Sequence, residues 1–321
     1  MIKRMSIKKL IVSGVVLFAI FLIYLIPSKD QYELKVDQEL EYVESNVNTH
    51  TVFLMNDNNY LVQTNVIIEE QENIEKKAKE LLNTLIKGSN KEDLIPNGFK
   101  AIINSETKIN SLTFKDGVIK VDFSSALLDT NKDMEEKIIE AIVYTLTSIK
   151  EVEYIIIYID GEILTKLPQS NITLPSTLDR SFGINKEYNI SSDKNITKTT
   201  IYYIDTINDN TYYVPVTKVN NDQRDKIEII VDELSSNNLY KTNLMSYLNN
   251  NTEILSVNEE NEKLILEFNS YIYNDIDTKD ILEEVIYTIC MSIDDNYENI
   301  SEVVFIENNE EIYKTSSKTI E

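Results

Sequence analysis

The sequence predicts an α+β protein: an N-terminal transmembrane helix, followed by two tandem copies of a small domain with a mixed sheet and two helices each. Three observations predict this class. An apolar run follows a basic N-terminus, alternating strands are interleaved with amphipathic helices, and the same order of elements occurs twice. The expected boundaries are residues 1–9 for a cytoplasmic tail, 10–26 for the transmembrane helix, 27–50 for a stalk, 51–167 for the first domain, 168–196 for a linker and 197–315 for the second domain.

Residues 10–26 are almost all apolar and would form a helix about 25 Å long, which is close to the minimum for crossing a bilayer. Lys3, Arg4, Lys8 and Lys9 precede this run without an acidic residue, so the N-terminus is expected in the cytoplasm and the rest outside. The run ends without the small-residue cleavage site of a secreted protein, and no cysteine lies nearby to carry a lipid. We therefore expect a single-pass protein of the cell membrane with extracytoplasmic C-terminal domains.

In the first domain, apolar residues at helical spacing predict one helix over residues 74–85 and another over 134–149. Residues 119–123 alternate as in a half-buried strand, and the Lys-Asp-Gly sequence at 115–117 predicts a hairpin turn before them. Residues 154–159 are apolar on both faces, which is typical of a central strand. The domain is thus expected to pack two helices on a sheet.

The two domains are expected to be copies of one another because four pairs of segments match in the same order. Tyr144-Thr145 of the first copy aligns with Tyr287-Thr288 of the second. Between the copies, residues 168–196 are rich in Ser, Thr, Asn and Pro, which is typical of a connector. The matching pairs are 51–54 with 200–203, 78–85 with 227–234, 121–128 with 266–273, and 139–149 with 282–293.

Composition excludes several classes of function. The formal net charge of −23 would repel a phosphate backbone, so no nucleic acid is expected as a partner. The single cysteine, Cys290, rules out an intramolecular disulfide and any metal cluster that needs several thiolates. No calcium loop, phosphate-binding glycine loop or dinucleotide motif occurs, so no cofactor is expected.

Few residues suggest catalysis. The only histidine, His50, lies at a predicted strand start, where a surface role is expected. Cys290 lies on the inward side of a predicted helix and is expected to be core packing. Asp122, Ser124 and Ser125 stand together where a strand gives way to a helix, and such residues ordinarily serve turns. We expect no catalytic, cofactor-binding or metal-binding residues and no enzyme activity.

The first copy resembles the GerM domain, the sporulation and spore germination family. The second copy departs from the pattern: it has no glycine after Gly183, no counterpart of residues 96–98, and Asn308-Asn309 where the first copy has Asp160-Gly161. The segments that carry the resemblance are Val52-Phe53-Leu54, KELLNTLIKG ending at Gly88, Ile95-Pro96-Asn97-Gly98, GVIKVDFSSAL, AIVYTLTSI and Asp160-Gly161.

The resemblance implies a role at the developing spore envelope. Domains of this family look like the ring-building domains of secretion systems, and tandem members are implicated in assembling the channel complex between mother cell and forespore. The resemblance therefore implies partners among envelope proteins of that channel, and it transfers no catalytic residues. Tandem members are typically lipoproteins, so the missing lipid-carrying cysteine leaves the N-terminal helix as the expected membrane attachment.

Three hypotheses follow. The first is a membrane-anchored assembly or interaction protein of sporulation or germination, which binds through sheet edges or helix faces. The second is a cell-wall hydrolase, which needs two carboxylates converging in a cleft at roughly 5 to 9.5 Å. The third is a module that binds peptidoglycan or another small ligand in an aromatic-lined groove, which the 19 tyrosines permit.

Overall fold

The computed structural model describes residues 49–236 and 243–316 of the chain. The predicted cytoplasmic tail and transmembrane helix, and all but the last two residues of the predicted stalk, lie outside the described residues. The described residues belong to one compact unit. Within these two ranges, no helix is both long enough and apolar enough to cross a membrane.

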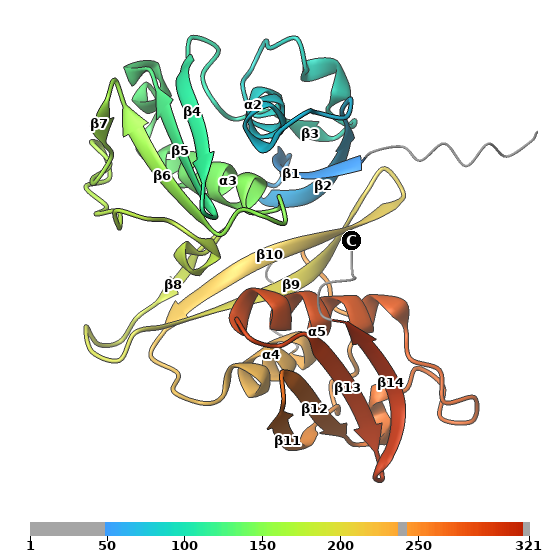
Figure 1. The fold of residues 1–321 in the computed structure, drawn as a ribbon. Coiled ribbons are helices and arrows are strands. Elements are labelled where there is room, and N and C mark those ends of the chain that lie inside the picture. Colours follow the sequence, from blue (N-terminus) through green and yellow to red (C-terminus); the bar gives the residue numbers. More distant parts are fainter. Residues whose placement is uncertain (1–48, 237–242, 317–321) are drawn as a thin grey trace, which may run out of the picture. The chain divides into compact units, whose positions relative to one another are not determined.

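The first repeat begins with a hairpin and continues into a four-stranded sheet with two α-helices (Figure 1). The four-stranded sheet has the order β4-β5-β6-β7, in which β5 and β6 are parallel and the outer pairs antiparallel. A parallel pair needs a crossover connection, and α3 supplies it. The elements are β1 (Thr49–Asn56), β2 (Leu61–Ile67), α2 (Ile74–Thr84), β3 (Phe99–Lys100), β4 (Ile109–Lys115), β5 (Val118–Phe123), α3 (Lys132–Leu146), β6 (Tyr154–Ile159) and β7 (Glu162–Ile163).

Turn and capping residues set the limits of these elements. Asp116 and Gly117 have φ of 50° and 77°, the left-handed conformation that a two-residue hairpin turn requires between β4 and β5. Asn73 and Asn131 cap α2 and α3, since each side chain accepts a main-chain N–H three residues further on. The hairpin, the two helices and the central strand predicted for this repeat are confirmed.

The second repeat has the same order of elements. Its four-stranded sheet runs β11-β12-β13-β14, again with the central pair parallel, and α5 makes the crossover. The predicted duplication and the α+β class are therefore confirmed. The elements are β9 (Thr197–Ile207), β10 (Asn210–Asn220), α4 (Lys226–Ser235), β11 (Ile254–Glu260), β12 (Lys263–Phe268), α5 (Glu283–Asn296), β13 (Glu302–Glu307) and β14 (Glu310–Ser316).

The segment between the repeats is itself folded. It contains a short 3₁₀ helix, η3 (Arg180–Phe182), and a strand, β8 (Glu187–Asn189), which pairs in parallel with β10 of the second repeat. Earlier in the segment, Leu178 and Ile155 of β6 exchange two main-chain hydrogen bonds, of 2.7 and 2.8 Å. The region expected to be a connector therefore adds backbone pairing to both repeats.

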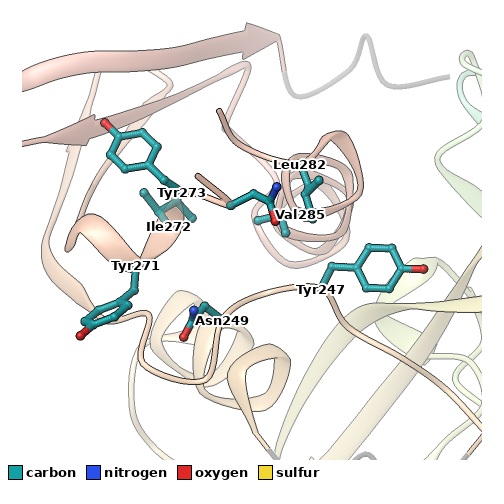
Figure 2. A pocket seen from close by; sticks show the side chains of 8 residues that line it. Tyr247, Asn249, Tyr271, Ile272, Tyr273, Leu282 and Val285 are labelled. Carbon is teal, nitrogen blue, oxygen red and sulfur yellow. The ribbon is translucent and has the colours of Figure 1, made fainter. Parts of the chain in front are cut away.

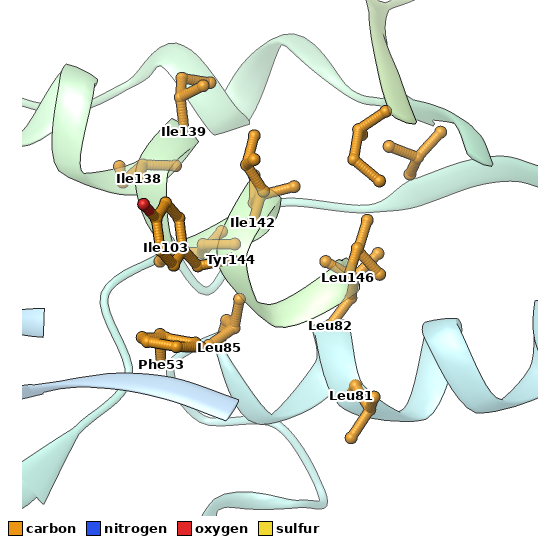
Figure 3. Close-up of a cluster of buried hydrophobic side chains, with 14 of the residues drawn as sticks. Phe53, Leu81, Leu82, Leu85, Ile103, Ile138, Ile139, Ile142, Tyr144 and Leu146 are labelled. Atoms are coloured by element: carbon orange, nitrogen blue, oxygen red, sulfur yellow. The ribbon is translucent and has the colours of Figure 1, made fainter. Parts of the chain in front are cut away.

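Each repeat has its own apolar core. In the first, Phe53 of β1 lies beside Leu85, which follows α2, and belongs to one buried cluster with Leu82 of α2 and Leu146 of α3 (Figure 3). The Phe53 and Tyr144 rings meet edge to face at 5.2 Å. Full burial of one such side chain contributes about 1.5–3 kcal/mol, so these contacts hold hairpin and helices together.

The structure equates different residues of α3 and α5 than the sequence alignment does. Thr145 Oγ1 accepts the Phe53 N–H at 3.0 Å, and in the second repeat it is Ser292 Oγ that accepts the Tyr202 N–H, at 2.9 Å. Thr288, which the alignment places on Thr145, instead bonds to carbonyls within α5. The alignment of the two Tyr-Thr pairs is therefore wrong by one helical turn, because a turn of shift preserves the apolar stripe that guided it.

Arg180 joins the helices of the two repeats. Its guanidinium bonds to the Asp295 carboxylate of α5 at 2.6 Å and to Thr147 Oγ1, next to α3, at 3.2 Å. The guanidinium carbon also lies 5.0 Å from the centre of the Tyr144 ring, and Tyr202 donates to the second oxygen of Asp295. The Asp295 side chain is only 1% exposed, so its carboxylate is held out of water, while the Arg180 side chain is 27% exposed.

Asn185 joins the hairpins of the two repeats. Its side-chain amide accepts the Leu61 N–H of β2 and donates to the carbonyls of Leu61 and Pro215, all within 2.9 Å. Pro215 lies in β10 and has no N–H for a sheet ladder. The amide therefore supplies the hydrogen bonds that join β2 to β10 at this point.

The Pro-Asn-Gly motif of the first repeat also contacts the second. The Asn208 side chain, in the β9–β10 turn, donates to the Asn97 carbonyl at 3.0 Å. Gly98 has a φ of 96°, and a Cβ at this position would lie 2.6 Å from Ile207. Glycine is thus required here both by the backbone conformation and by the neighbouring repeat.

Candidate functional site

The polar cluster noted at the end of β5 has a structural role. Asp122 Oδ1 accepts the Gly161 N–H at 3.0 Å, and Ser124 Oγ accepts the Lys108 N–H at 3.0 Å. The Ser125 N–H donates to Asp160 at 3.1 Å. These oxygens satisfy turn amides, as predicted from their place between a strand and a helix.

His50 and Cys290 belong to different repeats and have different environments. His50 is the second residue of β1 and is half-buried. Cys290 is completely buried in the core of the second repeat, as predicted. Burial, with a smaller effect of the Asp294 carboxylate, raises the pKa of the Cys290 thiol to about 12, and a neutral thiol is a poor nucleophile.

Over residues 49–236 and 243–316, no group of three or more His, Cys, Asp or Glu side chains is placed to hold a metal ion. The acidic side chains there are spread over the surface and the junction.

A small pocket of about 120 Å³ lies in the second repeat (Figure 2). Its floor comes from the 3₁₀ helix η5 (Ser270–Ile272) and the start of α5, which contribute Ile272, Leu282 and Val285. Tyr271 and Tyr247 lie at its rim with 45% and 43% of their surface exposed. The remaining lining residues are Asn249, Tyr273 and Asn274.

The pocket combines apolar and amide groups. Figure 2 shows the Asn249 side chain between Tyr271 and Tyr247, whose rings point outward from the pocket, and the Tyr273 hydroxyl points away as well. The Asn249 side-chain oxygen, Oδ1, accepts the Asn251 N–H at 2.9 Å. An apolar floor with tyrosines and asparagine amides at its edge suits a ligand that has one apolar group flanked by polar groups.

Acidic side chains follow the lining residue Asn274 in the chain. The loop between η5 and α5 exposes Asp275, Asp277 and Asp280 with one lysine, Lys279, and α5 begins with the exposed Glu283. The local charge is therefore negative, which favours a ligand with cationic groups.

A second exposed apolar surface lies on the edge strand β11. Leu255 and Val257 are 59% and 37% exposed on this strand, which is paired on one side only. Such an edge offers unpaired main-chain groups to another strand.

Another hollow, of about 260 Å³, lies beside the inter-repeat segment and is lined by charged groups that are already paired. Lys186 bonds to Glu136 at 2.8 Å and to Glu140 at 3.3 Å. Lys198 donates to the carbonyls of Ser181 and Phe182. These pairs make the hollow part of the junction rather than a ligand site.

Sequence reasoning did not identify Tyr247 or Tyr271. Tyr271 lies in the repeated segment at the position where the first copy has Ala126. This replacement of a small residue by an aromatic one was the feature of the sequence that could have identified Tyr271. Tyr247 has no such signal, because it lies between α4 and β11, where the two copies differ in sequence.

The fold defines a tandem α+β repeat protein, and the small pocket of its second repeat is a candidate binding site. The family model described as "Germane: Sporulation and spore germination" matches residues 51–165 and 200–313, and the chain belongs to this family. It is 29% identical over 247 residues to the spore germination protein GerM of Bacillus subtilis strain 168, covering 75% of this chain and 67% of that protein. The solved tandem GerMN domains of the Bacillus subtilis sporulation protein GerM match with a TM-score of 0.73 and 26% identity, covering 82% of this chain and 91% of that one.

Proposed function

We propose that this chain is a membrane-anchored, extracytoplasmic interaction protein of sporulation or germination, which supports an envelope complex between mother cell and forespore. The observation that carries the proposal is the family match over both repeats, because the relatives with this arrangement are named for sporulation and spore germination. Two repeats held together by Arg180 and Asn185 provide a rigid scaffold for binding, and the protein is proposed to be non-catalytic.

The cellular role is tested by deleting the gene in the bacterium that encodes it. The deletion is expected to lower the yield of heat-resistant spores or to slow germination, while vegetative growth stays normal. A deletion strain that sporulates and germinates like its parent would contradict the proposal.

The anchor is tested by fractionating cells that produce the full chain or a chain without residues 10–26. Because the run is apolar and follows four basic residues, the full chain is expected with the membranes, and external protease should digest it in protoplasts. A full chain that distributes like the shortened one would rule out the N-terminal helix as the anchor.

The tyrosine-lined pocket favours one alternative, which is binding to peptidoglycan, with or without hydrolysis. Purified peptidoglycan sacculi separate these functions. A wall-binding protein would sediment with sacculi and lose this property when Tyr247 and Tyr271 are replaced by alanine, and a hydrolase would also release soluble fragments.

A further inference from the structure

The pocket of the second repeat has a structural counterpart in the first. The Thr107 N–H donates to the Asn104 carbonyl at 3.0 Å, and the Thr252 N–H donates to the Asn249 carbonyl at 2.9 Å. Both loops precede the first strand of the four-stranded sheet, and in both repeats a 3₁₀ helix follows the second strand. The loop of Asn249 and the helix η5 are therefore equivalent to elements of the first repeat.

In the first repeat, a turn of the chain itself lies at this place. The main-chain N–H groups of Gln169 and Ser170 donate to the Glu135 carboxylate at 2.9 and 2.6 Å. The register of α3 and α5 set by their buried hydroxyls places Leu282, which lines the pocket, at the position of Glu135. A polypeptide turn in one repeat thus corresponds to the pocket in the other.

The two repeats differ in how the last strand continues. In the first, β7 ends at Ile163 and the chain leaves the sheet to form the turn, which is closed by the Leu167 N–H donating to the Ile172 carbonyl. In the second, β14 stays paired with β13 as far as Ser316. The described chain therefore places no such turn over the pocket.

We propose that this pocket receives a turn of a partner protein, with one aliphatic side chain packed on Ile272, Leu282 and Val285, the residues Tyr247 and Tyr271 on either side of the turn, and basic residues beside it. The inference rests on the proposed function as an interaction protein and names the kind of partner surface. The turn at Glu135 is the precedent for the polypeptide, and the carboxylates of Asp275, Asp277 and Asp280 favour its basic charge.

The size of the pocket also favours a side chain over a sugar. Small-molecule sites usually measure about 300–1,000 Å³, and a cavity of about 150 Å³ is enough for benzene. A pocket of about 120 Å³ therefore suits one branched aliphatic group, and Asn249 and Asn274 contribute side-chain amides to its lining.

The probe is a phage-displayed library of disulfide-closed eight-residue turns, selected on the purified region from residue 47 onward, which contains both cores. Selected turns are expected to carry Leu, Ile or Val next to Lys or Arg. Their affinity should fall at least about tenfold when Tyr247 and Tyr271 are both replaced by alanine, because the bound turn would cover both exposed rings. Tyr154→Ala is the matched control, because this tyrosine is 41% exposed in the first repeat.

Two results would overturn the inference. One is a set of selected turns whose binding is unchanged in the double variant, and the other is displacement of the turns from the pocket by soluble peptidoglycan fragments. The second result would assign the pocket to the cell wall instead.

A cellular test separates this inference from the proposed function. The Tyr247→Ala/Tyr271→Ala chain, made at normal levels from its own gene, is expected to reproduce the deletion phenotype, and Tyr154→Ala is not. Normal spores from the double variant, together with defective spores from the deletion, would refute the pocket inference and leave the proposed function standing. Normal spores from both would refute the proposed function.

Discussion

Asn185 has a φ of 48°, a conformation that asparagine tolerates better than most residues other than glycine. Its main-chain N–H donates to Glu140 at 2.8 Å, while its side chain joins β2 to β10. One residue thus satisfies polar groups of both repeats at a place where it is 4% exposed. An asparagine is needed because it carries both a donor and an acceptor on a short side chain.

Replacing Asn185 by aspartate should therefore be costly, although the shape of the side chain is kept. The carboxylate cannot donate to the carbonyls of Leu61 and Pro215, and the charge that it adds lies near Glu140 as well as 3.4 Å from the Lys137 ammonium, which offsets only part of the loss. We expect a loss of roughly 3 kcal/mol in the free energy of unfolding, measured by urea denaturation.

The matched control is Asn195→Asp. Asn195 also has a positive φ, of 56°, but is exposed, so a change within about 0.5 kcal/mol is expected. Equal effects at the two positions would show that the amide of Asn185 is not important.

The buried thiol of Cys290 is expected to make the stability of the protein depend on pH. Its pKa is about 12 in the folded protein, against 9.0 for an unperturbed thiol, so the folded state binds the proton more tightly. The stability that this contributes is complete below pH 9 and is lost as pH rises from 9 towards 12, by up to about 4 kcal/mol. Cys290→Ala should show a flatter decline of stability than the parent over this range.

The same burial predicts chemical inertness. Cys290 in the native protein is not expected to react with a thiol reagent at pH 8, and it should react at once in denaturant. Rapid labelling of the native protein would mean that the second core opens readily.

At the scale of elements, the one-turn shift between α3 and α5 can be tested. Thr145→Val leaves the Phe53 N–H without its acceptor, and Ser292→Ala does the same to the Tyr202 N–H. Each change should cost about 1–3 kcal/mol, because a buried donor is left unsatisfied. Thr288→Val should cost less than about 1 kcal/mol, since its hydroxyl bonds only to carbonyls of its own helix.

Chemical denaturation of these three variants gives the comparison. If Thr288→Val were as damaging as Thr145→Val, the two Tyr-Thr pairs would be equivalent after all.

Local patterns explain which elements were predictable. The turn at Asp116-Gly117, the apolar stripes of the helices and the doubly apolar strand at residues 154–159 depend on neighbouring residues, and all three were predicted. The bonds of Arg180 and Asn185 join residues far apart in sequence, so no periodicity revealed them. The pocket was missed for the same reason, because the segments with Tyr247 and Tyr271 meet only in the folded repeat.

At the scale of the whole molecule, the ion pair of Arg180 and Asp295 couples the repeats. Arg180→Leu leaves the Asp295 carboxylate buried and unpaired, and loss of one partner of a buried pair costs about 3–5 kcal/mol. The parent is expected to unfold in one transition, and the variant should unfold earlier, with the two repeats separating.

Arg224→Leu is the control, because the pair of Arg224 with Asp222 is on the surface and a change below about 1 kcal/mol is expected. Fluorescence from the tyrosines, recorded together with circular dichroism, follows the transitions. A parent protein that already unfolds in two steps would contradict the coupling.

The pairing of Leu178 with Ile155 shows that the duplicated stretch is shorter than the chain that contributes hydrogen bonds to the first repeat. The stretch that was duplicated ends near β7 in one copy and β14 in the other, whereas the chain that follows β7 still donates hydrogen bonds to the first repeat. Recombination that moved the duplicated stretch alone would leave β6 without Leu178 and Glu135 without its amide donors. The smallest genetic piece that can be exchanged without damage to the first repeat therefore reaches beyond Leu178.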